Sequence, residues 1–170
     1  MVDRRTTRLT GFAVAVATLL ADQLVKYAVT VPLALPERGV IPLIPFFDLR
    51  WVQNYGVSMG FLTAEGALGQ WLLVGLTAAI TIGVATWAWI ERRRWDVLAL
   101  GLVLGGALGN ILDRVRLGYV VDYADLHFGL WRPFYIFNLA DAAISIGVAI
   151  LVLRAILVRD VPAPSEDSHA

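Results

Sequence analysis

The sequence predicts an all-α membrane protein with four transmembrane helices, a small extracytoplasmic β-sheet and an outer loop over a polar site. Composition indicates the class: 58% of the 170 residues are hydrophobic and only 16% are charged, which is too apolar for a soluble domain of this length. Four apolar stretches without proline indicate the number of spans, because a helix needs about 20 apolar residues to cross the hydrocarbon core. An interval of alternating apolar and polar residues predicts the sheet.

The four spans are expected at residues 9–29, 68–90, 97–112 and 134–157. The third is short, and we expect it to continue through Asp113 and Arg114 at the membrane interface. The first follows a group of arginines, as the apolar part of a secretory signal peptide does. It is long, however, and no small-residue cleavage site followed by a soluble domain comes after it. We therefore interpret it as a retained helix.

The connection at residues 91–96 indicates the orientation of the chain. It is short and contains Arg92, Arg93 and Arg94, and short loops rich in arginine stay on the cytoplasmic side. An even number of spans then places both termini in the cytoplasm. The intervals 30–67 and 115–133, with most of the polar chemistry, are expected on the extracytoplasmic side.

The first outer interval predicts the sheet. It contains four prolines between positions 32 and 45, so a long helix is excluded. Beyond them Phe47, Leu49 and Trp51 alternate with other residues at the period of two that is typical of a strand with one apolar face. We expect this strand to lie on the membrane surface. Residues 1–160 are expected to form one domain, and the tail at 161–170, rich in proline, serine and acidic residues, is expected to be disordered.

Composition also narrows the chemistry. The chain has no cysteine, which excludes disulfides, thiolate nucleophiles and cysteine-ligated metals. Its two histidines, His127 and His169, are too few for a convincing metal site. No basic patch suggests a nucleic-acid partner. We therefore expect neither a metal nor a cofactor. Carboxyl and amide side chains remain as the groups that could carry out a reaction.

The first span carries Asp22 and Lys26, four residues apart on one helical face. An ionisable group inside a span is costly and suggests a function, but the interpretation we favour for these two residues is a structural ion pair near the outer interface. In the third span Gly101, Gly105 and Gly109 form a stripe that lets another helix approach closely. Packing is the simpler interpretation of the stripe, although close approach would also help to position the neighbouring Asn110.

Two amide and acid pairs are harder to explain as packing. Asn110 precedes Asp113 by three residues at the end of the third span, and Asn138 precedes Asp141 by three at the start of the fourth. This spacing places each pair on one helical face, so four polar groups are expected to converge at the outer ends of two helices. Arg114 could form a salt bridge with Asp113, which is the interpretation we favour, or bind an anionic lipid or substrate group.

Asp122 lies in an apolar, extended segment of the outer loop, where its neighbours would desolvate it. If the loop folds back over the helix ends, Asp122 and Asp141 can meet and share one proton, ready to activate water and protonate a leaving group. Asp125 is a competing partner. A solvated turn for Asp122 and a hydrogen-bonded helix cap for Asp141 are the structural alternatives, so these patterns predict a polar site and no particular reaction.

At these residues the chain closely resembles the lipoprotein signal peptidases of bacteria, the signal peptidase II family. Five motifs occur in order along nearly the whole chain: Asp22-Gln23 with Lys26, 54–61 (NYGVSMGF), 105–114 (GGALGNILDR), 120–123 (VVDY) and 137–141 (FNLAD). Each motif alone would be weak, whereas five in order on four spans are specific. One departure is Met59, where the family often has alanine.

The resemblance implies a membrane-embedded aspartic endopeptidase of the bacterial inner (cytoplasmic) membrane. Such an enzyme removes the signal peptide from prolipoproteins, N-terminal to a cysteine that carries diacylglyceryl, and needs no cofactor. Its partners would be this prolipoprotein and membrane lipid, and we expect a monomer. The resemblance assigns the catalytic pair to Asp122 and Asp141. It assigns substrate-binding or supporting roles to Asp22, Lys26, Asn54, Gly56, Gly106, Asn110, Asp113, Arg114, Asn138 and Ala140.

Two other functions are compatible with four spans. A small transporter or proton-conducting subunit could relay protons through Asp22, Asp113 and Asp141, but a relay needs acids at successive depths, and these gather near the outer third. A scaffold subunit held by the glycine stripe would leave the amide and acid pairs without a purpose. Both are ranked below the peptidase.

Overall fold

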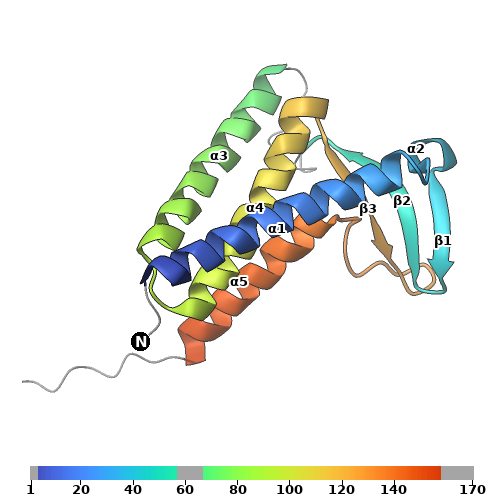
Figure 1. The fold of residues 1–170 in the computed structure, drawn as a ribbon. Helices are drawn as coiled ribbons and strands as arrows, with labels where there is room; N and C mark the ends of the chain where they lie inside the picture. The colour runs from blue at the N-terminus through green and yellow to red at the C-terminus, as the bar shows by residue number, and fades with distance from the viewer. Residues whose placement is uncertain (1–3, 57–66, 158–170) are drawn as a thin grey trace, which may run out of the picture.

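The computed structural model describes residues 4–56 and 67–157. Four of its helices are long and apolar enough to cross a membrane, and a small sheet lies at one end of them (Figure 1). The predicted class, helical with a small sheet, is therefore confirmed. The long helices are α1 (Arg4–Thr30), α3 (Ala67–Ile90), α4 (Arg94–Leu117) and α5 (Leu139–Leu157). The shorter elements are α2 (Leu35–Arg38), β1 (Val40–Ile44), β2 (Phe47–Asn54) and β3 (Val120–Leu126). The tail expected at 161–170 and the motif residues 57–61 lie outside the described residues.

Three predicted spans have bounds that differ from those of the helices. The first begins at Arg4 and not at 9. The third begins earlier than 97, because α4 includes Arg94, Trp95 and Asp96, which were expected in the loop. It continues through Asp113 and Arg114, as expected, to Leu117, and Gly118 ends it with a φ of 87°. The fourth begins at Leu139 and not at 134. Phe137 is extended instead, since its N–H donates to the Ala124 carbonyl at 3.1 Å and its own carbonyl accepts from the Ala124 N–H at 2.7 Å.

Helix α4 packs against α1, α3 and α5, and glycines allow the close approach of two of them. A Cβ on Gly101 would lie 2.5 Å from the Gly11 carbonyl oxygen of α1, and one on Gly109 would lie 2.5 Å from Asp22 Oδ2. No side chain fits at these positions without moving α1. The packing interpretation of the stripe is therefore confirmed, and the same stripe brings Asp22 against α4.

Gly106 allows α5 to approach α4 closely, as the stripe does for α1. This contact predicts how a substitution at Gly106 would change stability. A Cβ there would lie 2.5 Å from the Ala140 carbonyl oxygen and 2.9 Å from Ile144 Cγ1. We expect Gly106→Ala to lower the free energy of unfolding by about 1–3 kcal/mol, as overpacking does. Gly83→Ala in α3 is the matched control, because nothing lies within 4 Å of its added Cβ. Unfolding titrations in mixed micelles would measure both, and equal stabilities would contradict the packing argument.

The sheet has the antiparallel order β1-β2-β3. The strand predicted from Phe47 is confirmed as β2, with Leu49 buried. Strand β1 was not predicted, because Pro42 argues against a strand; it is tolerated here at the sheet edge. In the register of β2 and β3, Val52 lies opposite Asp122.

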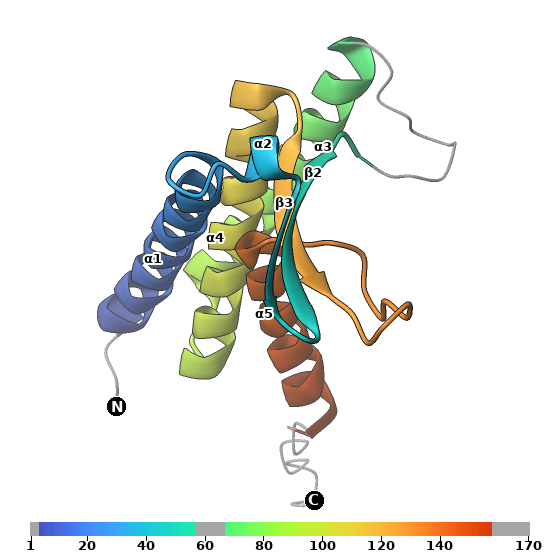
Figure 2. The same ribbon diagram turned by 90° about the vertical axis from the view of Figure 1, so that its right-hand side faces the viewer.

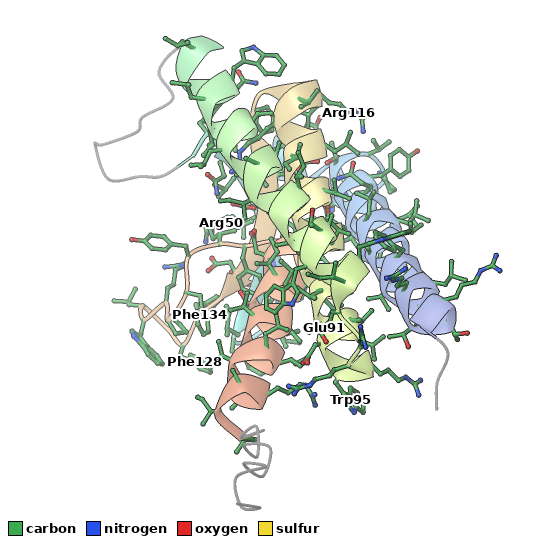
Figure 3. The ribbon with its side chains drawn as sticks, turned by 90° about the vertical axis from the view of Figure 1, so that its left-hand side faces the viewer. Arg50, Glu91, Trp95, Arg116, Phe128 and Phe134 are labelled. Carbon is green, nitrogen blue, oxygen red and sulfur yellow. The ribbon has the colours of Figure 1, made fainter. Side chains whose placement is uncertain are left out.

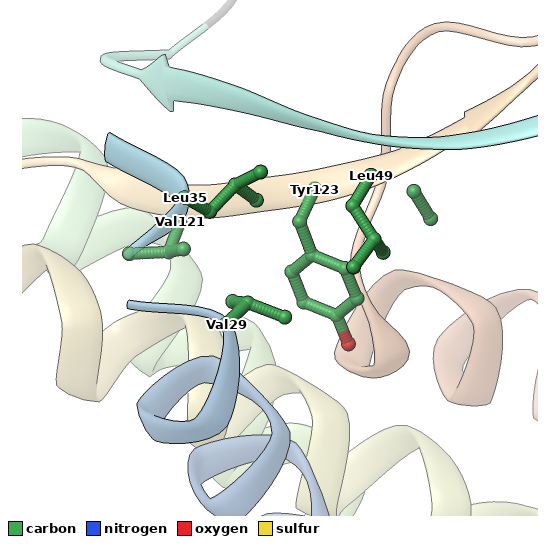
Figure 4. Packing of buried hydrophobic residues seen from close by; sticks show 6 residues of the cluster. Val29, Leu35, Leu49, Val121 and Tyr123 are labelled. Atoms are coloured by element: carbon green, nitrogen blue, oxygen red, sulfur yellow. The ribbon is translucent and has the colours of Figure 1, made fainter. Parts of the chain in front are cut away.

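An apolar core joins the sheet to the C-terminal end of α1. Its members are Val29, Leu35, Leu49, Val121, Tyr123 and Ala124, and Figure 4 shows most of them packed between strand and helix. Burial of this apolar surface holds the sheet against the helix end. The backbone of β3 is therefore fixed on both sides of Asp122.

Candidate active site

Asp122 lies in β3, between Val121 and Tyr123 of the apolar core, and its residue surface is 1% exposed. Two amides hold its carboxyl group. Asn54 Nδ2 donates to Oδ2 at 2.9 Å, and Asn138 Nδ2 donates to Oδ1 at 2.6 Å. Gly56 orients the first amide, since its N–H donates to Asn54 Oδ1 at 3.0 Å. Gly56 has a φ of 129°, a conformation that favours glycine.

Asp141 lies in the first turn of α5 and is half-buried. Its N–H donates to Asn138 Oδ1 at 2.9 Å, and its Oδ2 accepts from the Asn138 N–H at 3.3 Å. This reciprocal pair is a capping box, in which each residue satisfies a backbone N–H at the helix start. Asp141 accepts a further hydrogen bond through Oδ1, from Asn110 Nδ2 at 2.8 Å.

Asn138 connects the two acids. Besides Asp122, its Nδ2 contacts Asn110 Oδ1 at 3.2 Å, so two amides bridge from one carboxyl group to the other. Three members of the two predicted amide and acid pairs, Asn110, Asn138 and Asp141, meet through these contacts. Burial raises the pKa of Asp122 to about 6, and the charge of Asp141 adds to this effect while the hydrogen bond from Asn54 opposes it.

Lys26 and Asp22 of α1 form a cluster of charged side chains with Asp113 of α4, next to the amide of Asn110. Lys26 Nζ lies 2.8 Å from Asp22 Oδ2 and 2.8 Å from Asp113 Oδ2, and it donates to Asn110 Oδ1 at 3.2 Å. The predicted Asp22–Lys26 ion pair is therefore confirmed. The favoured salt bridge between Asp113 and Arg114 is wrong: Asp113 pairs with Lys26. Successive helical residues point about 100° apart, so Asp113 faces α1 and Arg114 does not.

Asp22 and Asp113 also accept hydrogen bonds from backbone N–H groups near the site. Asp22 Oδ1 accepts the Ala140 N–H at 3.1 Å, and Asp113 Oδ2 accepts the Val121 N–H at 3.1 Å. Ala140 is 0% exposed, so the start of α5 is anchored to α1 through this bond. Both acids thus fix the segments that carry Asp141 and Asp122.

Two further residues of the site were missing from the sequence prediction. Gln23 Nε2 donates to Asp113 Oδ1 at 3.0 Å and contacts Asp22 Oδ2 at 3.2 Å. Its place beside Asp22 in the first family motif was the available signal. The Tyr123 hydroxyl accepts the Leu139 N–H at 3.1 Å, a contact that no spacing indicates. Burial raises the pKa of Tyr123 to about 12, so its hydroxyl keeps its proton.

Arg114 of α4 lies near both carboxylates, since the charges of Asp141 and Asp122, as well as that of Asp113, act on its guanidinium group. Its Nη1 contacts the Asn110 carbonyl at 3.5 Å, and among the described residues its buried Nε has no hydrogen-bond partner. A buried guanidinium N–H without a partner is costly. Arg114 therefore has a donor available for an oxygen that enters the site.

Asp125, the competing acid, lies in a separate group. Arg50 Nε lies 2.8 Å from its Oδ2, and Arg132 Nε lies 3.0 Å from its Oδ1. Burial opposes its ionisation, but the hydrogen bonds and charges of Arg132 and Arg50 outweigh burial and hold the pKa of Asp125 below its usual range. It is therefore a paired carboxylate that does not face Asp141. Within residues 4–56 and 67–157 no three acidic or histidine side chains gather in a way that suits a metal ion.

Comparison with known proteins identifies the family. The family model for signal peptidase (SPase) II matches residues 14–157. The lipoprotein signal peptidase of Rhizorhabdus wittichii is 58% identical, covering 100% of this chain and 99% of that protein. The lipoprotein signal peptidase of Sphingopyxis alaskensis is 51% identical, with 88% and 87% covered. A solved bacterial membrane enzyme superposes with a TM-score of 0.74 at 29% identity, over 89% of this chain and 94% of the other. These matches along nearly the whole chain show that this multi-pass membrane protein belongs to the signal peptidase II family.

Proposed function

We propose that this protein cleaves diacylglyceryl-modified prolipoproteins N-terminal to the lipidated cysteine, with Asp122 and Asp141 as the catalytic pair. The main support is Asn138, which bonds to Asp122 through its side chain and to Asp141 through both its side chain and its backbone. Two carboxyl groups held this way, one with a raised pKa, suit acid–base hydrolysis. The family membership supports the choice of substrate.

In this mechanism Asp141 begins ionised and Asp122 begins protonated. Asp141 accepts a proton from the attacking water while Asp122 donates its proton to the scissile carbonyl oxygen, which gives a neutral tetrahedral diol. The proton on Asp141 then passes to the leaving nitrogen as the C–N bond breaks, and Asp122 recovers a proton from the diol. The free Nε–H of Arg114 is positioned to donate to a peptide oxygen of the substrate.

We infer that the site faces the extracytoplasmic side of the bacterial cytoplasmic membrane and that both termini lie in the cytoplasm. The arginine-rich connection between α3 and α4 supports this orientation. Figure 3 shows Glu91 and Trp95 at one end of the bundle and Arg116 at the other. The acids of the site belong to the Arg116 end, since Asp113 lies one turn before it. We expect the enzyme to act as a monomer.

A proton relay receives less support. Asp22 and Asp113 both contact Lys26, and Asn110 connects this group to Asp141, so these acids form one cluster. Asp96, near the other end of α4, pairs with Arg154. Among the described residues, no series of acids leads from one group to the other across the bundle.

The test of function is cleavage by the purified protein in detergent micelles. A precursor with a diacylglyceryl-modified cysteine should be cut on the N-terminal side of that cysteine, and the same precursor without the lipid should remain intact. A chelator should leave the rate unchanged, because the proposed chemistry uses only carboxyl groups. Equal cleavage of both precursors would contradict the substrate proposal, and loss of activity on chelation would contradict the mechanism.

The pH dependence of cleavage tests the role of Asp122. With a pKa of about 6, Asp122 holds its proton below that pH and loses it above, so cleavage should fall as pH rises through this value. Asn54→Leu removes a hydrogen bond that lowers this pKa. The variant should therefore move the alkaline limb of kcat/KM to higher pH.

Gln53→Leu is the control for that shift, because Gln53 is the exposed neighbour of Asn54 and its side-chain oxygen accepts a hydrogen bond from the Tyr55 hydroxyl, away from Asp122. Its alkaline limb should coincide with that of the unmodified protein. An unchanged limb in Asn54→Leu would show that Asp122 is not the group that supplies the proton.

A further inference from the structure

A group of arginines lies at the end of the bundle opposite the candidate active site, where the start of α1 meets the connection between α3 and α4. Figure 2 shows the start of α1, the start of α4 and the end of α5 at this end. A Cβ on Gly11 of α1 would lie 3.0 Å from the Val97 carbonyl oxygen of α4. The rings of Phe12 and Trp89 join α1 to α3, with centroids 6.1 Å apart. We call the arginines of the two segments the arginine cluster, and it consists of Arg5, Arg8, Arg92, Arg93 and Arg94.

Both described acids at this end already have partners. Glu91 accepts two backbone N–H groups of the connection, at 2.7 and 2.9 Å, and Asp96 pairs with Arg154 of α5. Positions 1–10 and 91–96 together contain six arginines and three acids, so this end of the bundle carries a net positive charge. Like charges repel one another, and the positive end of the helix dipole also opposes cations in the first turn of α4. An anion bound here would therefore relieve an unfavourable distribution of charge.

Exposed tryptophans indicate the depth of the arginine cluster. Trp87, Trp89 and Trp95 are all exposed at this end, and tryptophan favours the membrane interface, where the lipid headgroups lie. The guanidinium carbon of Arg8 lies 4.7 Å from the centroid of the Trp89 ring. This cation–π contact holds the guanidinium at the level of the headgroups. A stacked guanidinium keeps its N–H groups in its own plane, where they can bind a phosphate.

We propose that the arginine cluster binds the phosphodiester group of an anionic glycerophospholipid. Arginine forms two parallel N–H···O hydrogen bonds with a phosphate, which gives the contact a defined geometry. Arg5 lies about one turn before Arg8 on the same side of α1, and Arg92 and Arg94 are exposed on the connection. Guanidinium groups from two segments of the chain can therefore contact one lipid.

The bound lipid links the start of α1 to the connection between α3 and α4. It stabilises the fold, because its binding site exists only where the two segments meet. With the orientation proposed above, the site lies in the cytoplasmic leaflet, whose anionic lipids attract basic segments next to membrane spans. The arginine cluster is separate from the catalytic pair, so the proposal depends on neither the substrate nor the reaction.

Native mass spectrometry of the purified protein in non-ionic detergent micelles tests the proposal, with phosphatidylglycerol or phosphatidylcholine added at equal concentration. The two headgroups differ in net charge, so phosphatidylglycerol should bind about 10-fold more tightly and raise the melting temperature more. A cluster variant with four arginines changed to glutamine should lose this preference. Its substitutions are Arg5→Gln, Arg8→Gln, Arg92→Gln and Arg94→Gln. Arg38→Gln with Arg116→Gln is the matched control and should retain the preference, because both arginines are exposed and lie outside the arginine cluster.

Equal affinity for the two lipids, a preference that survives in the cluster variant, or an equal loss in the control would overturn the proposal. Inorganic phosphate distinguishes a lipid site from a site for a free anion. If phosphate raised the melting temperature as much as phosphatidylglycerol at equal concentration, the lipid assignment would be wrong. Should the cluster variant fail to insert, Arg5→Gln with Arg8→Gln retains the arginines of the connection, which direct the orientation. This double variant should still lower the affinity for phosphatidylglycerol about threefold, and an unchanged affinity would overturn the proposal.

Discussion

Replacing either Asp122 or Asp141 with asparagine should abolish cleavage, with kcat lowered by about 10⁴-fold or more. An amide cannot accept the proton of water or return one to the leaving group. The fold should persist, because asparagine has the same shape and each site is held by several amide contacts. Cleavage of the diacylglyceryl-modified precursor, measured beside an unfolding titration, separates lost chemistry from lost structure.

Asp125→Asn is the matched control for these variants, since Asp125 is a buried carboxylate of the same strand. It should weaken the contacts with Arg50 and Arg132 but retain cleavage. Near-normal turnover by Asp122→Asn or Asp141→Asn would contradict the catalytic assignment. Asp113→Asn should reduce stability at least as much as rate, and a folded but inactive Asp113 variant would make that residue a catalytic candidate again.

Lys26→Met should cause the largest loss of stability, about 3–5 kcal/mol in the free energy of unfolding. Lys26 is 4% exposed and lies 2.8 Å from both Asp22 and Asp113, which are 0% and 3% exposed. Without the ammonium group, two buried carboxylates would face each other unpaired. Titration with a denaturing detergent would measure the loss.

Two controls distinguish this effect from a general loss of packing. Adding Asp22→Asn and Asp113→Asn to Lys26→Met removes the unpaired charges and should recover part of the stability. Arg154→Met breaks the ion pair with Asp96 near the other end of α4, where the arginine side chain is 26% exposed, and should cost less. If Lys26→Met had the same free energy of unfolding as the unmodified protein, the cluster of Lys26, Asp22 and Asp113 would not stabilise the fold.

Much of the fold could be predicted from the sequence, because membrane spans and amphipathic strands leave simple patterns. The start of α5 could not, since the apolar residues from Phe134 to Phe137 have the hydropathy of a span. They are not helical, and Phe137 forms an antiparallel bridge with Ala124, thirteen positions earlier in the chain. Hydropathy does not report such a pairing.

The candidate site could likewise be predicted only in part. The i, i+3 spacing predicted that Asn110 and Asn138 would lie close to acids, as they do. Spacing could not show that Asp113 turns to Lys26, because the partner of a helical side chain depends on where the neighbouring helix lies. The pairing of Asp122 with Asp141 came from the family resemblance and stays a proposal that the two asparagine variants test.

The capping box at the start of α5 has a consequence for the reaction cycle. Asp141 accepts the Asn138 N–H as a carboxylate, and a carboxylate is a better acceptor than a carboxylic acid. While Asp141 holds the proton taken from water, that bond weakens and the first turn of α5 is less firmly closed. The first turn of α5 is then loosest while the tetrahedral diol is in place, and it closes again when the proton passes to the leaving nitrogen. Proton transfer at Asp141 and the closure of this helix end would therefore be coupled within each reaction cycle.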